Sequence, residues 1–213
     1  MKIIILNQQK NKYWLKKLVN IIKKNDPKNK IIHLEKIREI DIIKNNCELL
    51  ISFHNGQIIK PKIINLLKGY CINFHNSLLP KNRGWAPILW TAYNNNQFAT
   101  TIHKISDGLD TGDICAQKII KKSLKKYSLE DVYHLLEKES LILFKKIFYK
   151  IKREIITKKK VIKYKKQSIK GISYNNKSDT ETLMKKLPLG YNTKINEINL
   201  LSLKNQLKKI TYK

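Results

Sequence analysis

The sequence predicts an α/β protein whose twisted, mostly parallel sheet is flanked by helices. In the first third of the chain, short apolar runs alternate with amphipathic, lysine-rich segments, which is typical of βαβ units and a parallel sheet. Of the 213 residues, 42% are hydrophobic and 28% are charged. A chain of this length and composition can therefore bury a core and form one substantial domain, or one domain with a small appendage.

Apolar periodicity predicts the elements of the first half. Four short apolar runs are expected to be strands: residues 3–6, 31–34, 49–53 and 71–74. Apolar side chains from Trp14 to Ile22 share one helical face. A shorter helix is expected over residues 63–67, with Pro61 near its start. The run from Asn76 to Pro87 is rich in Pro, Asn and Gly and predicts a loop.

The second half begins with a short helix, expected from Ile88 to Tyr93. Strands are expected at 100–105 and 114–120, around a connection rich in Gly and Asp. The strongest helix signal comes next. Ser128 is a candidate N-cap before an acidic first turn, and an apolar stripe at helical spacing continues to Ile151.

The signal weakens after residue 151, so we expect a main domain over residues 1–151 and a short C-terminal extension over 152–213. The elements expected in the extension are a strand at 161–164, a second strand at 171–174 that pairs with it, a helix over 179–186 capped by Ser178, and a last helix over 200–210.

The net charge of +28 arises from 44 Lys and Arg against 16 Asp and Glu. Only three of the basic residues are Arg: Arg38, Arg83 and Arg153. A surface that grips nucleic-acid phosphate would use more Arg, because the guanidinium fork binds phosphate better than an ammonium does. The chain is also rich in Lys, Ile and Asn, whose codons are rich in A and T. Codon drift therefore explains the charge better than an anionic partner, and a basic nucleic-acid-binding module is the alternative.

Cysteine usage and apolar runs bear on the compartment. Cys47, Cys71 and Cys115 are odd in number and form no CxxC pair, which favours a reduced, cytoplasmic protein without a disulfide framework. No apolar stretch resembles a signal peptide or a membrane span, which needs roughly 18 uninterrupted apolar residues. The glycine signatures of dinucleotide-binding and P-loop proteins are missing as well, so neither class is expected.

Residues with catalytic chemistry gather between positions 73 and 113. Asn73-Phe74-His75 ends a predicted strand, and open α/β sheets bind ligands at the carboxyl ends of their strands. Strand alternation directs Asn73 and His75 to one side and Phe74 to the other. After His103 comes the acidic run 107–113 (DGLDTGD), whose carboxylates can orient an imidazole and raise its pKa. Each pattern alone is also typical of a local hydrogen-bonding feature or a solvated turn.

Together these segments resemble the 10-formyltetrahydrofolate-dependent formyltransferase family. Residues 73–80 (NFHNSLLP) are similar to the family signature N-x-H-x-S-L-L-P. Residues 107–113 resemble its D-x-G-x-D-T-G-D loop, apart from the position of one glycine, and His103 also lies at family spacing. The match spans about residues 49–120 with order intact. The resemblance implies a Rossmann-like formyltransferase core over residues 1–151.

The resemblance also implies the catalytic set and the co-substrate. Asn73, His75 and Asp110 match the catalytic positions. In this interpretation Asn73 and a protonated His75 donate hydrogen bonds to the formyl oxygen, where charge develops. Asp110 then orients His75 and helps to take the proton of the acceptor amine. No metal is implied, and zinc bound by His54 and His103 with His75 would lack a known ligand spacing.

10-Formyltetrahydrofolate is the implied co-substrate, and the family binds its pterin through backbone groups of the segment after the third strand. The residues implied to contact the folate are Gln57, Ile58, Ile59, Asp107, Gly108 and Asp110. The alternative for residues 56–59 is an ordinary loop between a strand and a helix.

Three branches of the family differ in their acceptor. Glycinamide ribonucleotide transformylases carry a glycine-rich first turn, where this chain has residues 7–10 (NQQK). Methionyl-tRNA formyltransferases resemble residues 77–88, but they carry a C-terminal barrel for which the extension is too short, and they usually lack a histidine at position 103. Residues 81–85 (KNRGW) and His103 are more similar to sugar N-formyltransferases. We therefore expect a nucleotide-linked amino sugar as acceptor, as in O-antigen biosynthesis, with methionyl-tRNA as the alternative.

Cations near the turn after His75 would anchor the pyrophosphate of such an acceptor. Lys81 and Arg83 follow this turn, and Arg83 is preferred because its fork binds phosphate in bidentate fashion. The alternative is that Arg83 ties down the loop through backbone carbonyls. Tyr174 is a candidate platform for stacking the base. No membrane partner is expected, and the oligomeric state is left open, a homodimer included.

Overall fold

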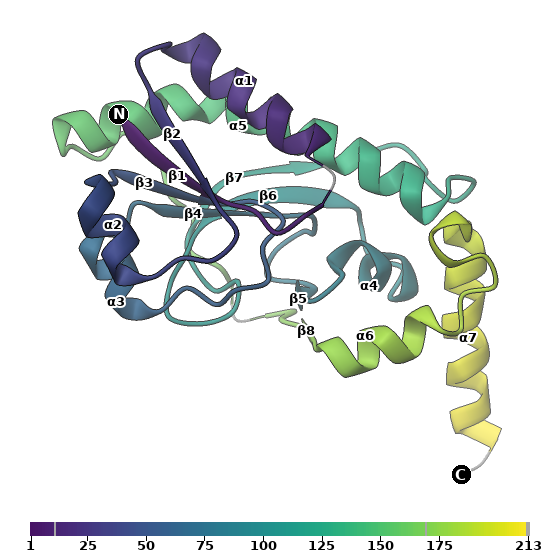
Figure 1. Ribbon diagram of the computed structural model, residues 1–213. Coiled ribbons are helices and arrows are strands. Elements are labelled where there is room, and N and C mark those ends of the chain that lie inside the picture. The colour runs from purple at the N-terminus through teal and green to yellow at the C-terminus, as the bar shows by residue number, and fades with distance from the viewer. Residues whose placement is uncertain (11, 169, 212–213) are drawn as a thin grey trace.

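The computed structural model describes residues 1–10, 12–168 and 170–211, which form a six-stranded sheet with helices on both faces (Figure 1). The strand order is β2-β1-β3-β4-β6-β7. The first four strands run parallel and are β1 (Lys2–Leu6), β2 (Lys30–Leu34), β3 (Leu49–Ser52) and β4 (Cys71–His75). β6 (Ala99–Lys104) and β7 (Ile114–Ile119) complete the sheet in antiparallel order.

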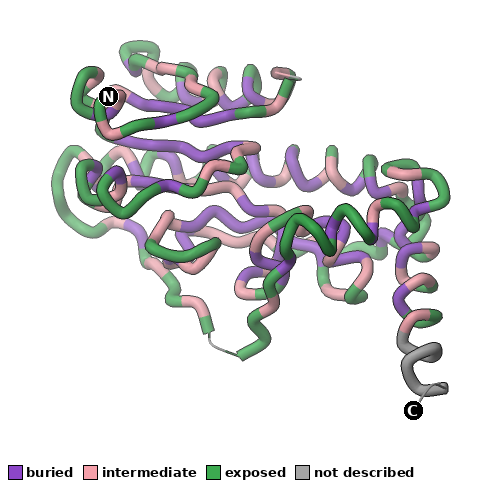
Figure 2. The backbone as a smooth tube through the Cα atoms, turned by 60° about the horizontal axis from the view of Figure 1, so that its bottom comes forward, coloured by how far each residue is buried: buried purple, intermediate pink, exposed green. Residues whose placement is uncertain are grey.

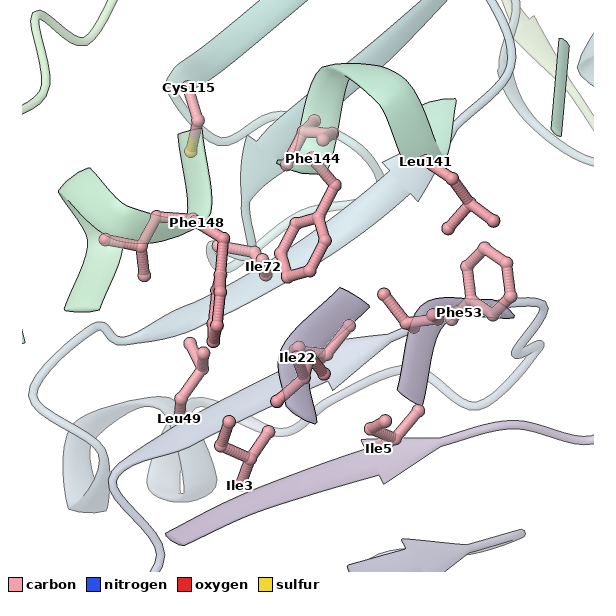
Figure 3. Close-up of a cluster of buried hydrophobic side chains, with 14 of the residues drawn as sticks. Ile3, Ile5, Ile22, Leu49, Phe53, Ile72, Cys115, Leu141, Phe144 and Phe148 are labelled. Atoms are coloured by element: carbon pink, nitrogen blue, oxygen red, sulfur yellow. The ribbon is translucent and has the colours of Figure 1, made fainter. Parts of the chain in front are cut away.

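Two helices cover one face of the sheet, α1 (Tyr13–Asn25) and α5 (Leu129–Thr157). Figure 3 shows Phe144 and Phe148 of α5 and Ile22 of α1 in one buried cluster with Ile3 and Ile5 of β1. The opposite face is covered by α2 (Glu39–Asn45) and α3 (Pro61–Leu66). Because side chains alternate along a strand, Ile4 of β1 belongs to this second cluster. The central strands β1 and β3 are thus buried between two helical layers, whereas the edge strand β2 is partly exposed (Figure 2).

A third hydrophobic cluster joins α4 (Pro87–Tyr93) and the start of α5 to the C-terminal extension. The extension contributes α6 (Lys177–Met184), the short 3-10 helix η1 (Gly190–Asn192) and α7 (Ile195–Thr211). The extension's buried residues in this cluster are Leu183 of α6, Leu187 after it, and Ile195 and Ile198 of α7. The extension therefore shares a core with the main domain.

The predicted α/β fold with a mostly parallel sheet is confirmed, and each predicted strand of the sheet lies within one or two residues of an observed one. Ser128 caps α5 as predicted, since its Oγ accepts a hydrogen bond from the Asp131 N–H. Helix α5 continues to Thr157, so the expected boundary after residue 151 falls inside it. The sequence interpretation missed α2 and the two-residue strand β5 (Arg83–Gly84).

The strands predicted in the extension are wrong. Residues 161–164 form no strand, because Glu154 of α5 accepts the backbone N–H groups of Val161 and Ile162 at 3.0 Å each. The segment predicted to pair with them instead leads into β8 (Tyr174–Asn175), which pairs with β5 in parallel. The next helix begins at Lys177 and is capped by Asn176, not by Ser178.

Candidate active site

A cavity of about 690 Å³ opens at the carboxyl ends of the parallel strands, where this class of sheet binds ligands. Its walls come from the loop after β1, the ends of β3 and β4, the loop between β6 and β7, and one face of α5. The three predicted catalytic residues, Asn73, His75 and Asp110, all line it, and so does His103.

Asn73, His103 and Asp110 form one hydrogen-bonded cluster. The amide Nδ2 of Asn73 lies 3.2 Å from Asp110 Oδ1 and 3.2 Å from His103 Nε2. His103 donates its Nδ1–H to the Lys104 carbonyl at 2.7 Å, so in the neutral ring Nε2 is the acceptor. His103 is 2% exposed. It therefore holds the Asn73 amide in one orientation, which was not predicted from the sequence.

This orientation changes the expected role of Asn73. Both hydrogens of its Nδ2 face protein acceptors, whereas no residue that the structure describes donates to its Oδ1. Reversing the amide would place Oδ1 against the Asp110 carboxylate. The atom of Asn73 that is free to bind a ligand in the cavity is therefore Oδ1, a hydrogen-bond acceptor, whereas the sequence analysis expected the amide N–H donor.

Asp110 sits in a loop that glycines make possible. A Cβ at Gly112 would lie 1.9 Å from the Lys104 carbonyl oxygen, and one at Gly108 would lie 2.6 Å from Thr111 Oγ1. Asp110 itself has a left-handed φ of 53°. Its Oδ2 accepts the Gly84 N–H at 2.9 Å. Burial raises the pKa of Asp110, but the attraction of the His75 imidazolium form and the hydrogen bond from this N–H oppose burial and hold the pKa well below 3.8.

His75 is buried beside this carboxylate. It donates Nε2–H to the Asn82 carbonyl at 2.9 Å, and its Nδ1 lies 3.4 Å from Asp110 Oδ2. Burial lowers the pKa of His75 below 6.5, and the neighbouring Asp110 carboxylate opposes this shift without reversing it. The expectation that His75 is kept protonated is therefore not met. At neutral pH its Nδ1 is a base whose protonated form the carboxylate would stabilise.

The lowered pKa of His75 predicts a pH-dependent stability. Between about pH 5 and 7 the unfolded chain binds a proton at this residue more readily than the folded one, so the free energy of unfolding should fall as the pH falls through 6.5. His75→Gln should flatten this slope in urea titrations at several pH values. Asp110 has its pKa below this window, so it contributes little there. His134→Gln, at an exposed position, is the matched control, and equal slopes in all three proteins would contradict the prediction.

The predicted folate residues divide into two groups. Gln57, Ile58, Ile59 and Gly108 line the cavity, whereas Asp107 is exposed outside it. The Gln57 side chain is engaged with the backbone of Ile37, in bonds of 2.9 Å to its N–H and to its C=O. The Ile58 side chain is 77% exposed, and its backbone forms no hydrogen bond with any residue that the structure describes. An apolar side chain beside open backbone groups fits a flat heterocycle.

The residues predicted to bind the nucleotide do not line the cavity. Lys81 is exposed, and Tyr174 lies outside the cavity on β8. Arg83 is 4% exposed, and its guanidinium donates to Tyr174 Oη at 2.9 Å and to Gln167 Oε1 at 2.6 and 3.2 Å. Arg83 therefore holds the loop in place, which is the alternative to phosphate binding named above. It does so by hydrogen bonds to other side chains rather than to backbone carbonyls.

Gln167 is a site residue that the sequence did not reveal. Its Nε2 donates to the carbonyls of Asp110 at 2.8 Å and Gly112 at 2.7 Å, within the turn that carries the Asp110 side chain. Its Oε1 is held by Arg83. A glutamine within a lysine-rich segment carries no sequence signal for this contact. Two exposed aromatic residues on the cavity wall, Trp85 and Tyr191, were also not assigned to the site.

Among the residues that the structure describes, no three His, Cys, Asp or Glu side chains are grouped to hold a metal ion. None of the described helices is long and apolar enough to cross a membrane.

The fold and the site define an α/β enzyme with an Asn-His-Asp cluster at the carboxyl end of its sheet. A family model described as formyl transferase matches residues 2–147, and the chain belongs to this family. The predicted family and class of enzyme, a formyltransferase, are therefore confirmed.

Solved structures extend the similarity to most of the chain. The formyltransferase PseJ from Anoxybacillus kamchatkensis has a TM-score of 0.79 and 28% identity, over 93% of this chain and 97% of that one. It was solved with UDP-4,6-dideoxy-4-formamido-L-AltNAc and tetrahydrofolate. The N-formyltransferase from Helicobacter canadensis, solved with folinic acid and dTDP-3-aminofucose, has a TM-score of 0.65 over 92% of this chain and 79% of that one. At 21% identity it supports the fold alone.

Curated relatives match a shorter region. The methionyl-tRNA formyltransferase of Agathobacter rectalis is 40% identical over 91 residues, which are 40% of this chain and 29% of the relative. That of Prochlorococcus marinus (strain AS9601) is 37% identical over 106 residues, or 49% and 31% of the two chains. The chain thus matches less than a third of the length of these relatives.

Proposed function

We propose that the protein transfers a formyl group from 10-formyltetrahydrofolate to the primary amine of a nucleotide-linked amino sugar. The observation that carries the proposal is the cluster of Asn73, His75 and Asp110 on the wall of a cavity of about 690 Å³. The likeness to PseJ supports the choice of acceptor, because it covers nearly all of both chains.

The residues of this chain position the amine and receive its proton. The open Oδ1 of Asn73 accepts one amine N–H and so directs the nitrogen lone pair. As the new bond forms, the nitrogen loses a proton to Nδ1 of His75, and Asp110 stabilises the imidazolium from 3.4 Å. Bound folate supplies the formyl carbon as the electrophile. The proton held at His75 then leaves with the folate nitrogen from which the formyl group departs.

The folate would lie against residues 57–59 and the loop around Gly108. The exposed Ile58 side chain offers an apolar surface for the pterin, and the open backbone of this segment offers a donor and an acceptor for its ring edge. Asp107, outside the cavity, is not part of this set.

The proposal predicts which acceptor is used. The protein should formylate one or more members of a panel of UDP- and dTDP-linked amino sugars when 10-formyltetrahydrofolate is supplied, with the product identified by mass spectrometry. Initiator methionyl-tRNA in the same assay tests the second candidate, which the sequence similarity to methionyl-tRNA formyltransferases favours. Formylation of the tRNA alone would overturn the sugar assignment. Omitting the folate donor is the control.

A cytoplasmic location is part of the proposal, since the three cysteines are free thiols. The homodimer stays a prediction.

A further inference from the structure

One wall of the cavity carries polar atoms that the protein leaves without partners. Among the described residues, eight buried side-chain nitrogen or oxygen atoms have no hydrogen bond, and five of them belong to Gln9, His54, Asn76 and Glu137. His54 Nε2 and Glu137 Oε2 form an ion pair with each other, which leaves three atoms without any partner: Gln9 Oε1, His54 Nδ1 and Asn76 Oδ1. All four residues line the cavity, as does Tyr133. We call these five residues the Glu137 wall. Buried polar groups without partners destabilise a protein, so their concentration at a cavity points to a ligand that supplies the partners.

Glu137 is the centre of this wall. Its side chain is 2% exposed, and its Oε1 accepts a hydrogen bond from Asn76 Nδ2 at 2.6 Å. Its Oε2 lies 2.9 Å from Nε2 of His54. His54 lies two residues after the end of β3 and has a left-handed φ of 54°, a conformation that is strained for a residue with a Cβ and is often found at functional sites.

These contacts determine what the wall can bind. Asn76 uses its amide nitrogen on Glu137, so its Oδ1 is left as an acceptor. Gln9 donates its amide nitrogen to Tyr133 Oη at 2.7 Å, so its Oε1 is left as an acceptor too. When His54 directs Nε2–H toward the Glu137 carboxylate, its Nδ1 becomes a third acceptor.

Tyr133 adds a donor to the three acceptors. Burial raises the pKa of Tyr133 to about 12, so its hydroxyl keeps its proton at neutral pH. A group that both donates and accepts hydrogen bonds fits this set. A phosphate does not fit, because it is an acceptor with negative charge and would face the Glu137 carboxylate.

We propose that the Glu137 wall binds the hydroxyl or amide N–H substituents of the acceptor sugar ring, and that the diphosphate of the acceptor lies away from it. The proposal rests on the proposed function. It makes Glu137 and Tyr133 determinants of acceptor specificity. Asn76 and Glu137 line the same cavity as Asn73, His75 and Asp110, so a sugar ring held at this wall shares the cavity with the proposed catalytic cluster.

The test compares Glu137→Gln with the wild type on the panel of nucleotide-linked amino sugars, dTDP-3-aminofucose included. The variant keeps the shape of the side chain but removes the charge and exchanges an acceptor for a donor. We expect KM for the amino sugar to rise at least about tenfold. The kcat and the affinity for a stable folate analogue should stay close to wild type, and the affinity for free UDP or dTDP should not fall.

Glu139→Gln is the matched control, since Glu139 lies two residues away on α5, pairs with Lys118 and does not line the cavity. Tyr133→Phe is the second variant, in case Glu137→Gln fails to fold, and it should raise the same KM. An unchanged KM in a folded variant of either residue would overturn the proposal and leave formyl transfer to sugars intact. A wild type that formylates no sugar while it binds the folate analogue would instead overturn the proposed function, and this proposal with it.

Discussion

Asp110→Asn is expected to lower kcat by about 10²–10⁴-fold, the range for loss of acid–base catalysis, while the protein stays folded. The substitution keeps the shape of the side chain but removes the charge that stabilises a proton on His75, 3.4 Å away. Both carboxylate oxygens of Asp110 accept hydrogen bonds, one from Asn73 Nδ2 and one from the Gly84 N–H. An asparagine side chain replaces one of these acceptors by an NH₂ group, so one of the two hydrogen bonds is lost. Steady-state kinetics with the formylated product as readout would measure the loss.

Asp107→Asn provides a control from the same loop, three residues earlier. Its carboxylate is exposed and does not line the cavity, so kcat should stay within a factor of about two, as for surface substitutions with little effect on stability. Equal losses in the two variants would mean that loop charge in general, rather than the contact between Asp110 and His75, supports the reaction.

Deleting residues 158–213 is expected to unfold the protein. The deletion removes Leu183, Leu187, Ile195 and Ile198, which are buried to within 7% exposure against α4 and α5. Burying each such side chain contributes about 1.5–3 kcal/mol. Their combined loss is comparable to the whole stability of a typical domain, about 5–15 kcal/mol. Thermal unfolding followed by circular dichroism should show no cooperative transition.

Two point substitutions test whether buried contacts of the extension stabilise the protein in the full-length chain. Ile198→Ala opens a cavity at a fully buried position of α7 and should cost about 2–5 kcal/mol. Leu189→Ala, at a position that is 63% exposed, should change the free energy of unfolding by less than about 0.5 kcal/mol. A truncated chain that unfolds cooperatively near the melting temperature of the full chain would show that residues 1–157 fold without the extension.

The centre of the sheet could be predicted from the sequence because β1 and β3 are short apolar runs that are buried between two helical layers, as at Ile3 to Leu6. The extension could not be predicted in the same way. Val161 and Ile162 have the composition of a strand, yet the Glu154 carboxylate takes their N–H groups. This acceptor lies in the last turn of the preceding helix, seven residues before Val161, and apolar periodicity does not reveal that a carboxylate competes for these N–H groups.

For the candidate active site, the positions of the residues could be predicted from the sequence, but the orientation and protonation of their side chains could not. The positions of Asn73, His75 and Asp110 follow from two motifs, and the structure brings these residues together. The orientation of the Asn73 amide depends on His103, and the protonation of His75 depends on burial, so neither can be read from motif spacing. Contacts made by single polar residues, such as Gln167 and Glu137, require the fold itself.

Arg83 donates to Gln167, and Gln167 donates to the Asp110 carbonyl. These hydrogen bonds couple the conformation of the segment around Gln167 to the conformation of the turn that carries Asp110. By linkage, whatever stabilises one stabilises the other by the same free energy. Substrate bound against Asp110 would therefore slow the local opening of the segment around Gln167, and a sequence change that loosens this segment would reduce the fraction of molecules competent for reaction. Selection for turnover thus acts on residues well outside the family signature.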